Sequence, residues 1–247
     1  MTRLRHHVAG FLLAAALCAA CGATARAQAI NEGFDNVPML TGAGWVMQNL
    51  SQAIGLSGWQ QGNNNVFIAH TGAPNSYISA NFENAGNGPG QDIISNWLIS
   101  PIRTFSNGDT IRFYARSDTP LGQTQFADRL QLRLSTAGAS TNVGATATSV
   151  GDFTMLLRDI NSTYGANPGE PYVLDTRWIQ FDVTLSGLGA PTQGRFAFRY
   201  FVEDGGPGGL RSNYIGIDTL TYTPIPEPAV LGVLAAPLLL IRRRVQR

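Results

Sequence analysis

The chain has 247 residues, a formal net charge of +1 and only 13% charged residues, with 17 arginines and no lysine. Its 44% of hydrophobic residues are enough to build a core, which excludes a largely disordered chain. The near-neutral total excludes the strongly basic surface that nucleic-acid binding usually requires.

The charges are distributed unevenly along the chain. Seven arginines lie in the first 27 or the last six residues, and Glu227 is the one acid outside residues 28–224. The segment between these ends holds ten arginines against 15 acids, which gives a net charge of −5. We therefore expect cations and neutral polymers as partners of this segment, and no nucleic acid.

The first 27 residues predict a secretory signal peptide. A basic start precedes 13 apolar residues, 8–20, and a small-x-small sequence follows, so we expect cleavage between Ala27 and Gln28. A helix of that length is about 20 Å long, against a hydrocarbon core of about 30 Å, which disfavours a permanent membrane span. Cys21 leaves a lipoprotein alternative open. Because Cys18 and Cys21 both lie here, the mature chain would have no disulfide and no cysteine zinc site.

Apolar and polar residues alternate repeatedly between residues 28 and 223, which predicts β-strands. The apolar positions that begin at Ile179, for example, alternate with Gln180, Asp182 and Thr184. No window has convincing helical spacing over three turns. The predicted strands are residues 97–102, 110–115, 128–135, 178–186, 194–202 and 214–222.

Strands without helical crossovers predict an antiparallel arrangement, because parallel strands need long, usually helical connections. The small polar residues 135–151 are interpreted as a long loop, with a linker or an edge ribbon as alternatives. We therefore predict one all-β domain, a jelly-roll β-sandwich over residues 28–223.

Six short motifs of this domain occur in a characteristic order. They are FDNVP (34–38), GW (44–45), NWLISP (96–101), IRFYAR (111–116), FADRLQLRLS (126–135) and YIGID (214–218). In their order and spacing the chain resembles the choice-of-anchor J family, which is related to the cleaved-adhesin modules of gingipain-type bacterial surface proteins. The resemblance implies a jelly-roll sandwich on an exported protein and implies no defined reaction.

The same resemblance implies a structural calcium ion where the first and last strands meet. On the matching motifs the acids are Asp35 and Asp218, and carboxylates are among the hard oxygen ligands that calcium prefers. The alternatives are a turn-capping side chain for Asp35 and an outward strand residue for Asp218. Alternation predicts that Asp218 faces away from Ile217, on the same side as Tyr214 and Leu220.

We expect no catalytic site, and a role in adhesion or exopolysaccharide association. His70, the one histidine after residue 27, has no GxSxG nucleophile elbow to serve and is interpreted as a surface or strand-end residue. The alternative function is carbohydrate binding or glycan hydrolysis. The 15 carboxylates would supply its acid and base, and aromatic rings would stack on sugars. Trp59, in a polar stretch, looks the most exposed tryptophan, and core packing is the default for most of the others.

The C-terminal segment, residues 224–247, has three parts. Pro226, Glu227 and Pro228 precede 13 apolar residues, 229–241, and then a cluster of arginines. This order resembles the PEP-CTERM sorting signal of Gram-negative bacteria, whereas a core helix would fit poorly with its internal proline. The resemblance implies recognition of the three motif residues by an exosortase, a membrane-embedded cysteine protease. It also implies transient membrane association of a short helix over 229–241 and delivery to the cell surface or an exopolysaccharide matrix.

Overall fold

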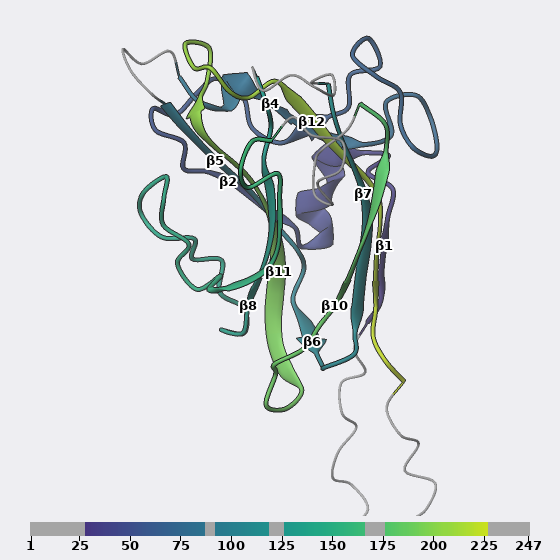
Figure 1. Ribbon diagram of the computed structural model, residues 1–247. Coiled ribbons are helices and arrows are strands. Elements are labelled where there is room, and N and C mark those ends of the chain that lie inside the picture. The colour runs from purple at the N-terminus through teal and green to yellow at the C-terminus, as the bar shows by residue number, and fades with distance from the viewer. Residues whose placement is uncertain (1–27, 87–91, 119–125, 166–175, 227–247) are drawn as a thin grey trace, which may run out of the picture.

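The alternating strands pack their apolar faces against one another, and the computed structural model is a two-layer β-sandwich (Figure 1). The structure describes residues 28–86, 92–118, 126–165 and 176–226. The predicted all-β sandwich of the jelly-roll class is confirmed. The strands are β1 (Ile30–Glu32), β2 (Val46–Asn49), β3 (Gln60–Gln61), β4 (Ile78–Asn81), β5 (Asp92–Ile99), β6 (Arg103–Phe105), β7 (Thr110–Ser117), β8 (Leu130–Ser135), β9 (Met155–Ile160), β10 (Ile179–Thr184), β11 (Thr192–Gly205) and β12 (Tyr214–Thr223).

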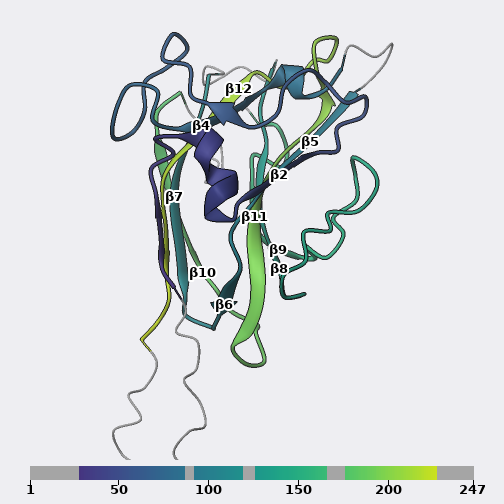
Figure 2. The same cartoon turned by 180° about the vertical axis from the view of Figure 1, so that it is seen from behind.

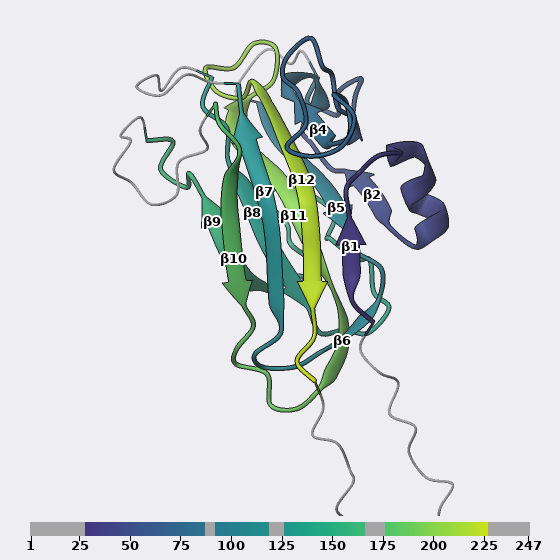
Figure 3. The ribbon, with the colours of Figure 1, turned by 90° about the vertical axis from the view of Figure 1, so that its right-hand side faces the viewer.

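The strands form two six-stranded antiparallel sheets that lie face to face (Figure 3). The first, called here the β12 sheet, has the order β10-β7-β12-β4-β3, with β1 paired to β12. The second, the β11 sheet, has the order β2-β5-β11-β8-β9, with β6 paired to β11. Two short 3-10 helices, η1 (Val37–Ala43) and η2 (Phe82–Asn84), complete the fold, and η1 buries Val37 and Leu40 beside β2.

The core lies between the two sheets and is formed by the predicted alternation. In β10 the side chains of Phe181 and Val183 are buried, whereas those of the alternating residues Gln180, Asp182 and Thr184 are exposed. In β11 every second residue from Phe196 to Val202 belongs to the main core. The rings of Phe113 and Phe198, one from each sheet, meet edge to face with their centroids 4.8 Å apart.

Several strand boundaries differ from the prediction. β5 begins at Asp92, earlier than predicted. It ends at Ile99, because Pro101 lacks the N–H that a further ladder bond would need. Six strands, β1, β2, β3, β4, β6 and β9, were not predicted. Five of them have at most four residues, too few alternations to be recognised, and the sixth, β9, has the sequence MLLRDI, in which apolar and polar residues do not alternate.

The connection between β8 and β9 is a loop, as predicted, and it covers the outer face of the β11 sheet (Figures 1 and 2). It buries Val143 and Phe153, and the ring of Phe153 lies 5.6 Å from that of Trp97 in β5. The outer face of this sheet therefore carries a small core of its own.

Both ends of the described chain lie at the same end of the sandwich (Figures 1 and 3). Beyond β12 the N–H of Ile225 donates to Oδ1 of Asp109 at 2.9 Å, and Oδ2 of Asp109 accepts the hydroxyl of Tyr222 at 2.6 Å. The chain is thus fixed to the fold up to Ile225, one residue before the predicted sorting motif.

Most residues of the predicted sorting and processing segments lie outside the part of the chain that the structure describes. Ala27, Glu227, Pro228 and the apolar run 229–241 lie outside the described residues, while Gln28 and Pro226 are exposed. Across the ranges that the structure describes, we find no helix with the length and apolar character of a membrane span.

Candidate functional site

Asp218 lies on the outer face of the β12 sheet and is completely buried beneath the loop that precedes β4. Its Oδ2 accepts the N–H groups of His70 at 2.8 Å and of Thr71 at 3.0 Å, and its Oδ1 accepts the N–H of Thr219. Burial raises the pKa of Asp218 above its ordinary value, and these three N–H groups lower it in part. Asp218 therefore caps a loop that covers it and is no exposed strand residue.

A β-bulge in β12 decides which residues share the face of Asp218. The pairing of β12 with β7 shifts between Asp218 and Thr221, and Thr219 has a φ of 49°. As a result Leu220 turns into the main core, and the prediction that it shares the face of Asp218 is wrong. Tyr214 does lie on that outer face, in a cluster with Phe67.

Asp35, the second predicted calcium ligand, is exposed and lies against the same loop. A methyl group in place of the Gly72 hydrogen would come 3.1 Å from Oδ1 of Asp35. In the structure Asp35 thus lies beside Gly72, and Asp218 is bonded to His70 and Thr71 of the same loop. In the part of the chain that is described, no three or more His, Cys, Asp or Glu side chains gather as a metal site. A calcium ion here would need backbone carbonyls or water as further ligands.

Three half-exposed rings, His70, Tyr114 and Trp178, lie on the same outer face. His70 stacks on Tyr114 with ring centroids 3.6 Å apart, and its Nδ1 lies 3.0 Å from the Thr219 hydroxyl. The indole N–H of Trp178 donates to the carbonyl of Ile68 at 3.0 Å. Each ring is therefore held in place by a stacking partner or a hydrogen bond.

A small buried cluster outside the main core supports these rings. It consists of Phe67, Tyr77 and Tyr214, and the Trp178 ring meets those of Phe67 and Tyr77 edge to face, each at 5.6 Å. Gly216 in β12 leaves the space that the cluster needs, because a Cβ there would lie within 2.8 to 2.9 Å of ring atoms of Trp178, Phe67 and Tyr77.

A row of polar side chains continues from these rings along β7 and β10. The pairing places Gln180 opposite Tyr114 and Asp182 opposite Arg112. The Tyr114 hydroxyl donates to Oε1 of Gln180 at 2.6 Å, and Nε2 of Gln180 donates to Asp182 at 2.6 Å. Nε of Arg112 donates to Asp182 at 2.5 Å, and the bonds from Arg112 and Gln180 lower the pKa of Asp182. The three rings and this polar row are together called the outer strip, which consists of His70, Arg112, Tyr114, Trp178, Gln180 and Asp182.

The sequence located part of this strip. Alternation predicted that Gln180 and Asp182 face away from the core, and they do. Trp59 looked the most exposed tryptophan but is buried, and Trp178 is the one that is partly exposed. Tyr114 was not singled out, although the apolar residues on either side of it in the predicted strand already imply that it points outward.

Comparison with solved structures identifies the fold. The K1 cleaved adhesin domain of Lys-gingipain from Porphyromonas gingivalis W83 is similar with a TM-score of 0.52 and 21% identity, covering 81% of this chain and 99% of that domain. The K3 domain of the same protein has a TM-score of 0.45 and 19% sequence identity, and the match covers 80% of this chain and 99% of that domain. A variant of a family 29 carbohydrate-binding module has a TM-score of 0.37 and 14% sequence identity, and the match covers 81% of this chain and 94% of that module.

The chain therefore has an adhesin-like β-sandwich fold, as its structural similarity to the K1 domain shows. Neither a protein-family model nor a curated protein sequence matches it. The resemblances to choice-of-anchor J domains and to PEP-CTERM tails remain predictions.

Proposed function

We propose that this chain is an exported, non-enzymatic protein of the cell surface or extracellular matrix that binds polysaccharide through the outer strip. The observation that carries the proposal is the placement of three half-exposed rings beside a hydrogen-bonded row of planar polar groups. A sugar ring offers an apolar face for stacking and hydroxyl groups for hydrogen bonds. A site of this kind needs aromatic surface together with a few fixed polar groups.

The polar row is suited to hydroxyl groups because its members are already positioned. Asp182 is charged and exposed, so its remaining lone pairs can accept from a sugar hydroxyl. Arg112 uses Nε on Asp182 and keeps further N–H donors for a ligand. Because the strip is fixed before binding, little side-chain freedom is lost when a ligand arrives.

The test measures binding of the secreted protein to the exopolysaccharide of the organism that produces the protein. We expect Trp178→Ala and Tyr114→Ala each to weaken binding about tenfold, which corresponds to about 1.4 kcal/mol. Phe82→Ala is the control, because Phe82 is an exposed ring that lies outside the strip. Equal affinities of the wild type and the two strip variants would overturn the assignment of the strip.

The same samples test the hydrolytic alternative. Release of new reducing ends from the polysaccharide, abolished by substituting a carboxylate with its amide, would contradict a non-enzymatic role. We expect no release by the wild-type protein.

We further propose that the chain is exported through its first 27 residues and sorted by an exosortase that recognises Pro226, Glu227 and Pro228. Two observations support this. The N–H of Ile225 donates to Asp109, so the chain is held to the fold up to the residue before the motif. Both ends of the described chain lie at one end of the sandwich, so an anchor there would leave the sandwich free to project.

A calcium ion near Asp35 and Asp218 is part of the proposal as a structural element. Both carboxylates lie against residues 70–72, and a bound cation would join β12 to this loop and to the turn after β1. Such an ion would steady the loop that carries His70.

A further inference from the structure

The outer face of the β11 sheet, on the opposite side of the sandwich, carries a row in which aromatic rings and arginines alternate. The guanidinium carbon of Arg199 lies 4.8 Å from the ring centroid of Trp97 and 3.9 Å from that of Phe201. Arg129 lies 5.1 Å from Phe201 and 6.0 Å from Tyr164. The row ends at Arg211, a loop residue whose guanidinium lies 3.9 Å from the Tyr164 ring.

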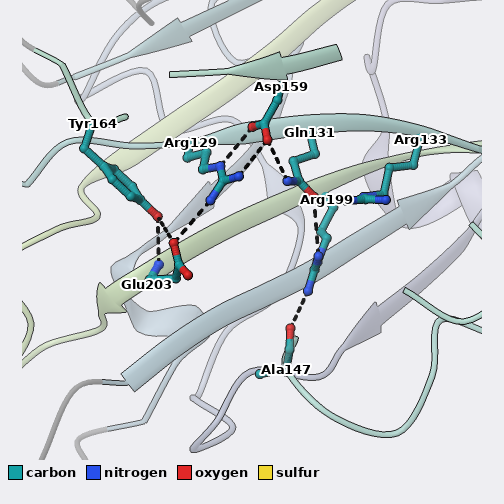
Figure 4. A network of polar contacts seen from close by, with 8 residues as sticks. All are labelled: Arg129, Gln131, Arg133, Ala147, Asp159, Tyr164, Arg199 and Glu203. Atoms are coloured by element: carbon teal, nitrogen blue, oxygen red, sulfur yellow. Dashed lines mark hydrogen bonds and ion pairs between the residues drawn. The ribbon is translucent and has the colours of Figure 1, made fainter. Parts of the chain in front are cut away.

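Two acids on the strands of this face, Asp159 and Glu203, are both engaged by Arg129 (Figure 4). Arg129 binds the two oxygens of Asp159 at 2.9 and 2.6 Å and Glu203 at 3.2 Å. In the described parts of the chain, no carboxylate lies within 4.0 Å of the guanidinium groups of Arg133, Arg199 or Arg211. Among the described residues of this face, positive charge is therefore in excess, although residues 28–224 carry a net charge of −5.

Arg199 cannot itself meet a ligand, because only 1% of it is exposed. Its nitrogens donate to the Ser95 hydroxyl at 3.0 Å, to Oε1 of Gln131 at 3.4 Å and to the carbonyl of Ala147 in the covering loop. Burial, and next the charge of Arg133, lower the pKa of Arg199 to about 9. Arg199 thus holds the loop in place and adds to the positive potential beneath the surface.

Arg133 and Arg211 are half-exposed and keep donors free. Arg133 donates through Nε to Gln131 at 2.9 Å and through Nη1 to the carbonyl of Phe153 at 3.3 Å, while its Nη2 has no acceptor among the described residues. The side-chain nitrogens of Arg211 likewise have no hydrogen-bond acceptor among the described residues. Stacking on Tyr164 orients this guanidinium without using any N–H, and such a group is ready to bind an anionic group in its own plane.

Tyr164 is fixed in turn, so the position of Arg211 is determined by the fold. The Tyr164 hydroxyl accepts the backbone N–H of Glu203 at 2.9 Å and donates to its carboxylate at 3.4 Å. The backbone N–H of Arg211 donates to the carbonyl of Asp204 at 2.9 Å.

We propose that this face is a second binding surface, which takes the acidic groups of a carboxylated or sulfated polysaccharide on Arg211 and Arg133. The inference goes beyond the function proposed above, because it names a different sheet face and a charged ligand. An acidic polysaccharide fits better than a single-stranded nucleic acid, which needs open ring faces for its bases. Here Phe201 and Tyr164 are only 7% and 6% exposed and are covered by arginines.

The experiment measures the affinity of the secreted protein for polygalacturonate, dextran sulfate and neutral dextran. We expect Arg133→Gln and Arg211→Gln each to weaken binding to polygalacturonate or dextran sulfate about fivefold to tenfold, because each removes charge-assisted hydrogen bonds. Raising the salt concentration should weaken wild-type binding further. Arg103→Gln is the matched control, since Arg103 is a half-exposed arginine of β6 that belongs to neither binding surface and donates to the carbonyl of Ile102.

A second pair of variants separates this proposal from the outer strip. Trp178→Ala should leave binding to the acidic polymers unchanged, and Arg211→Gln should leave binding to the host polysaccharide at the strip unchanged if that polymer is neutral. Melting temperatures of all variants within a few degrees of the wild type would show that each is folded.

Three results would overturn the proposal. One is an equal loss of acidic-polymer binding in Arg103→Gln and Arg211→Gln. Another is wild-type affinity for neutral dextran as high as for polygalacturonate and dextran sulfate. The third is tighter binding to single-stranded DNA than to either acidic polymer, which would assign the face to nucleic acid.

Discussion

Asp218 shows how a single carboxylate can be both buried and hydrogen bonded on the outer face of a sheet. Without a cation, its raised pKa means that the native state holds the proton more tightly than the unfolded chain does. Its contribution to stability is therefore present below the ordinary value of 3.8 and is lost as the pH rises through the raised value. Bound calcium would reverse this preference, because it favours the ionised carboxylate.

We predict that calcium raises the melting temperature of the protein at neutral pH. At a concentration about 100 times the Kd the gain would be about 2.7 kcal/mol, or roughly 5 to 10 °C for a domain of this size. The gain should shrink as the pH falls through the raised pKa of Asp218, since protons then compete with the ion. Differential scanning calorimetry with calcium and with a chelator measures both effects.

Asp218→Asn should abolish the response to calcium, whereas Asp182→Asn should retain it, because Asp182 is an exposed acid of the same sheet face. If the wild-type melting temperature is the same with calcium and with chelator, Asp35 and Asp218 do not form a calcium site.

Strand β12 combines a glycine and a bulge, and together they shape the outer strip. The bulge after Asp218 lets Leu220 enter the core while Asp218 stays on the outer face. Gly216 leaves room for the rings of Phe67, Tyr77 and Trp178 to lie over the strand. The position of Trp178 is therefore set by a strand two places away in the sheet.

We predict that Gly216→Ala displaces this ring cluster. The added methyl group would overlap three rings, and overpacking of this kind costs about 1 to 3 kcal/mol. The melting temperature should fall, the tryptophan fluorescence should change and binding at the outer strip should weaken. Gly189→Ala is the control, because a Cβ at Gly189 meets nothing within 4 Å. Identical behaviour of the two variants would show that the cluster does not depend on Gly216.

At the scale of the whole molecule, the two ends of the described chain, residues 28 and 226, lie at one end of the sandwich, and the two proposed binding surfaces lie on opposite outer faces. An anchor at the C-terminal side would hold the sandwich by that end and leave both faces accessible to polymers. A protein of this form would connect two polysaccharides, one bound on each face.

We predict that removal of residues 226–247 changes where the protein goes. The shortened chain should be released into the medium, whereas the intact chain should remain at the cell surface or in the matrix and have a lower mass than the unprocessed chain. Cell fractionation and mass spectrometry make the comparison, and substitution of Glu227 alone by Gln tests the motif with the apolar run intact. The same location and the same processed mass for both chains would contradict exosortase sorting.

The sequence was sufficient to predict the all-β class, the long strands and the outward direction of Gln180 and Asp182. These features follow from alternation, which depends only on near neighbours in the chain. It was not sufficient to predict that Trp59 is buried and Trp178 partly exposed. Trp59 follows Gly58 and Trp178 precedes Ile179, so their neighbours in the chain suggest the opposite of what the packing of distant loops decides.

The folded chain alone showed which residues meet across strands and beneath loops. The stack of His70 on Tyr114 joins residues 44 positions apart, and the contact of Arg211 with Tyr164 joins residues 47 apart. Such contacts depend on strand order, register and a bulge, and a bulge shifts every later residue to the other face. Alternation within one strand carries no information about its partner, and for that reason the two proposed binding surfaces could be recognised only in the tertiary structure.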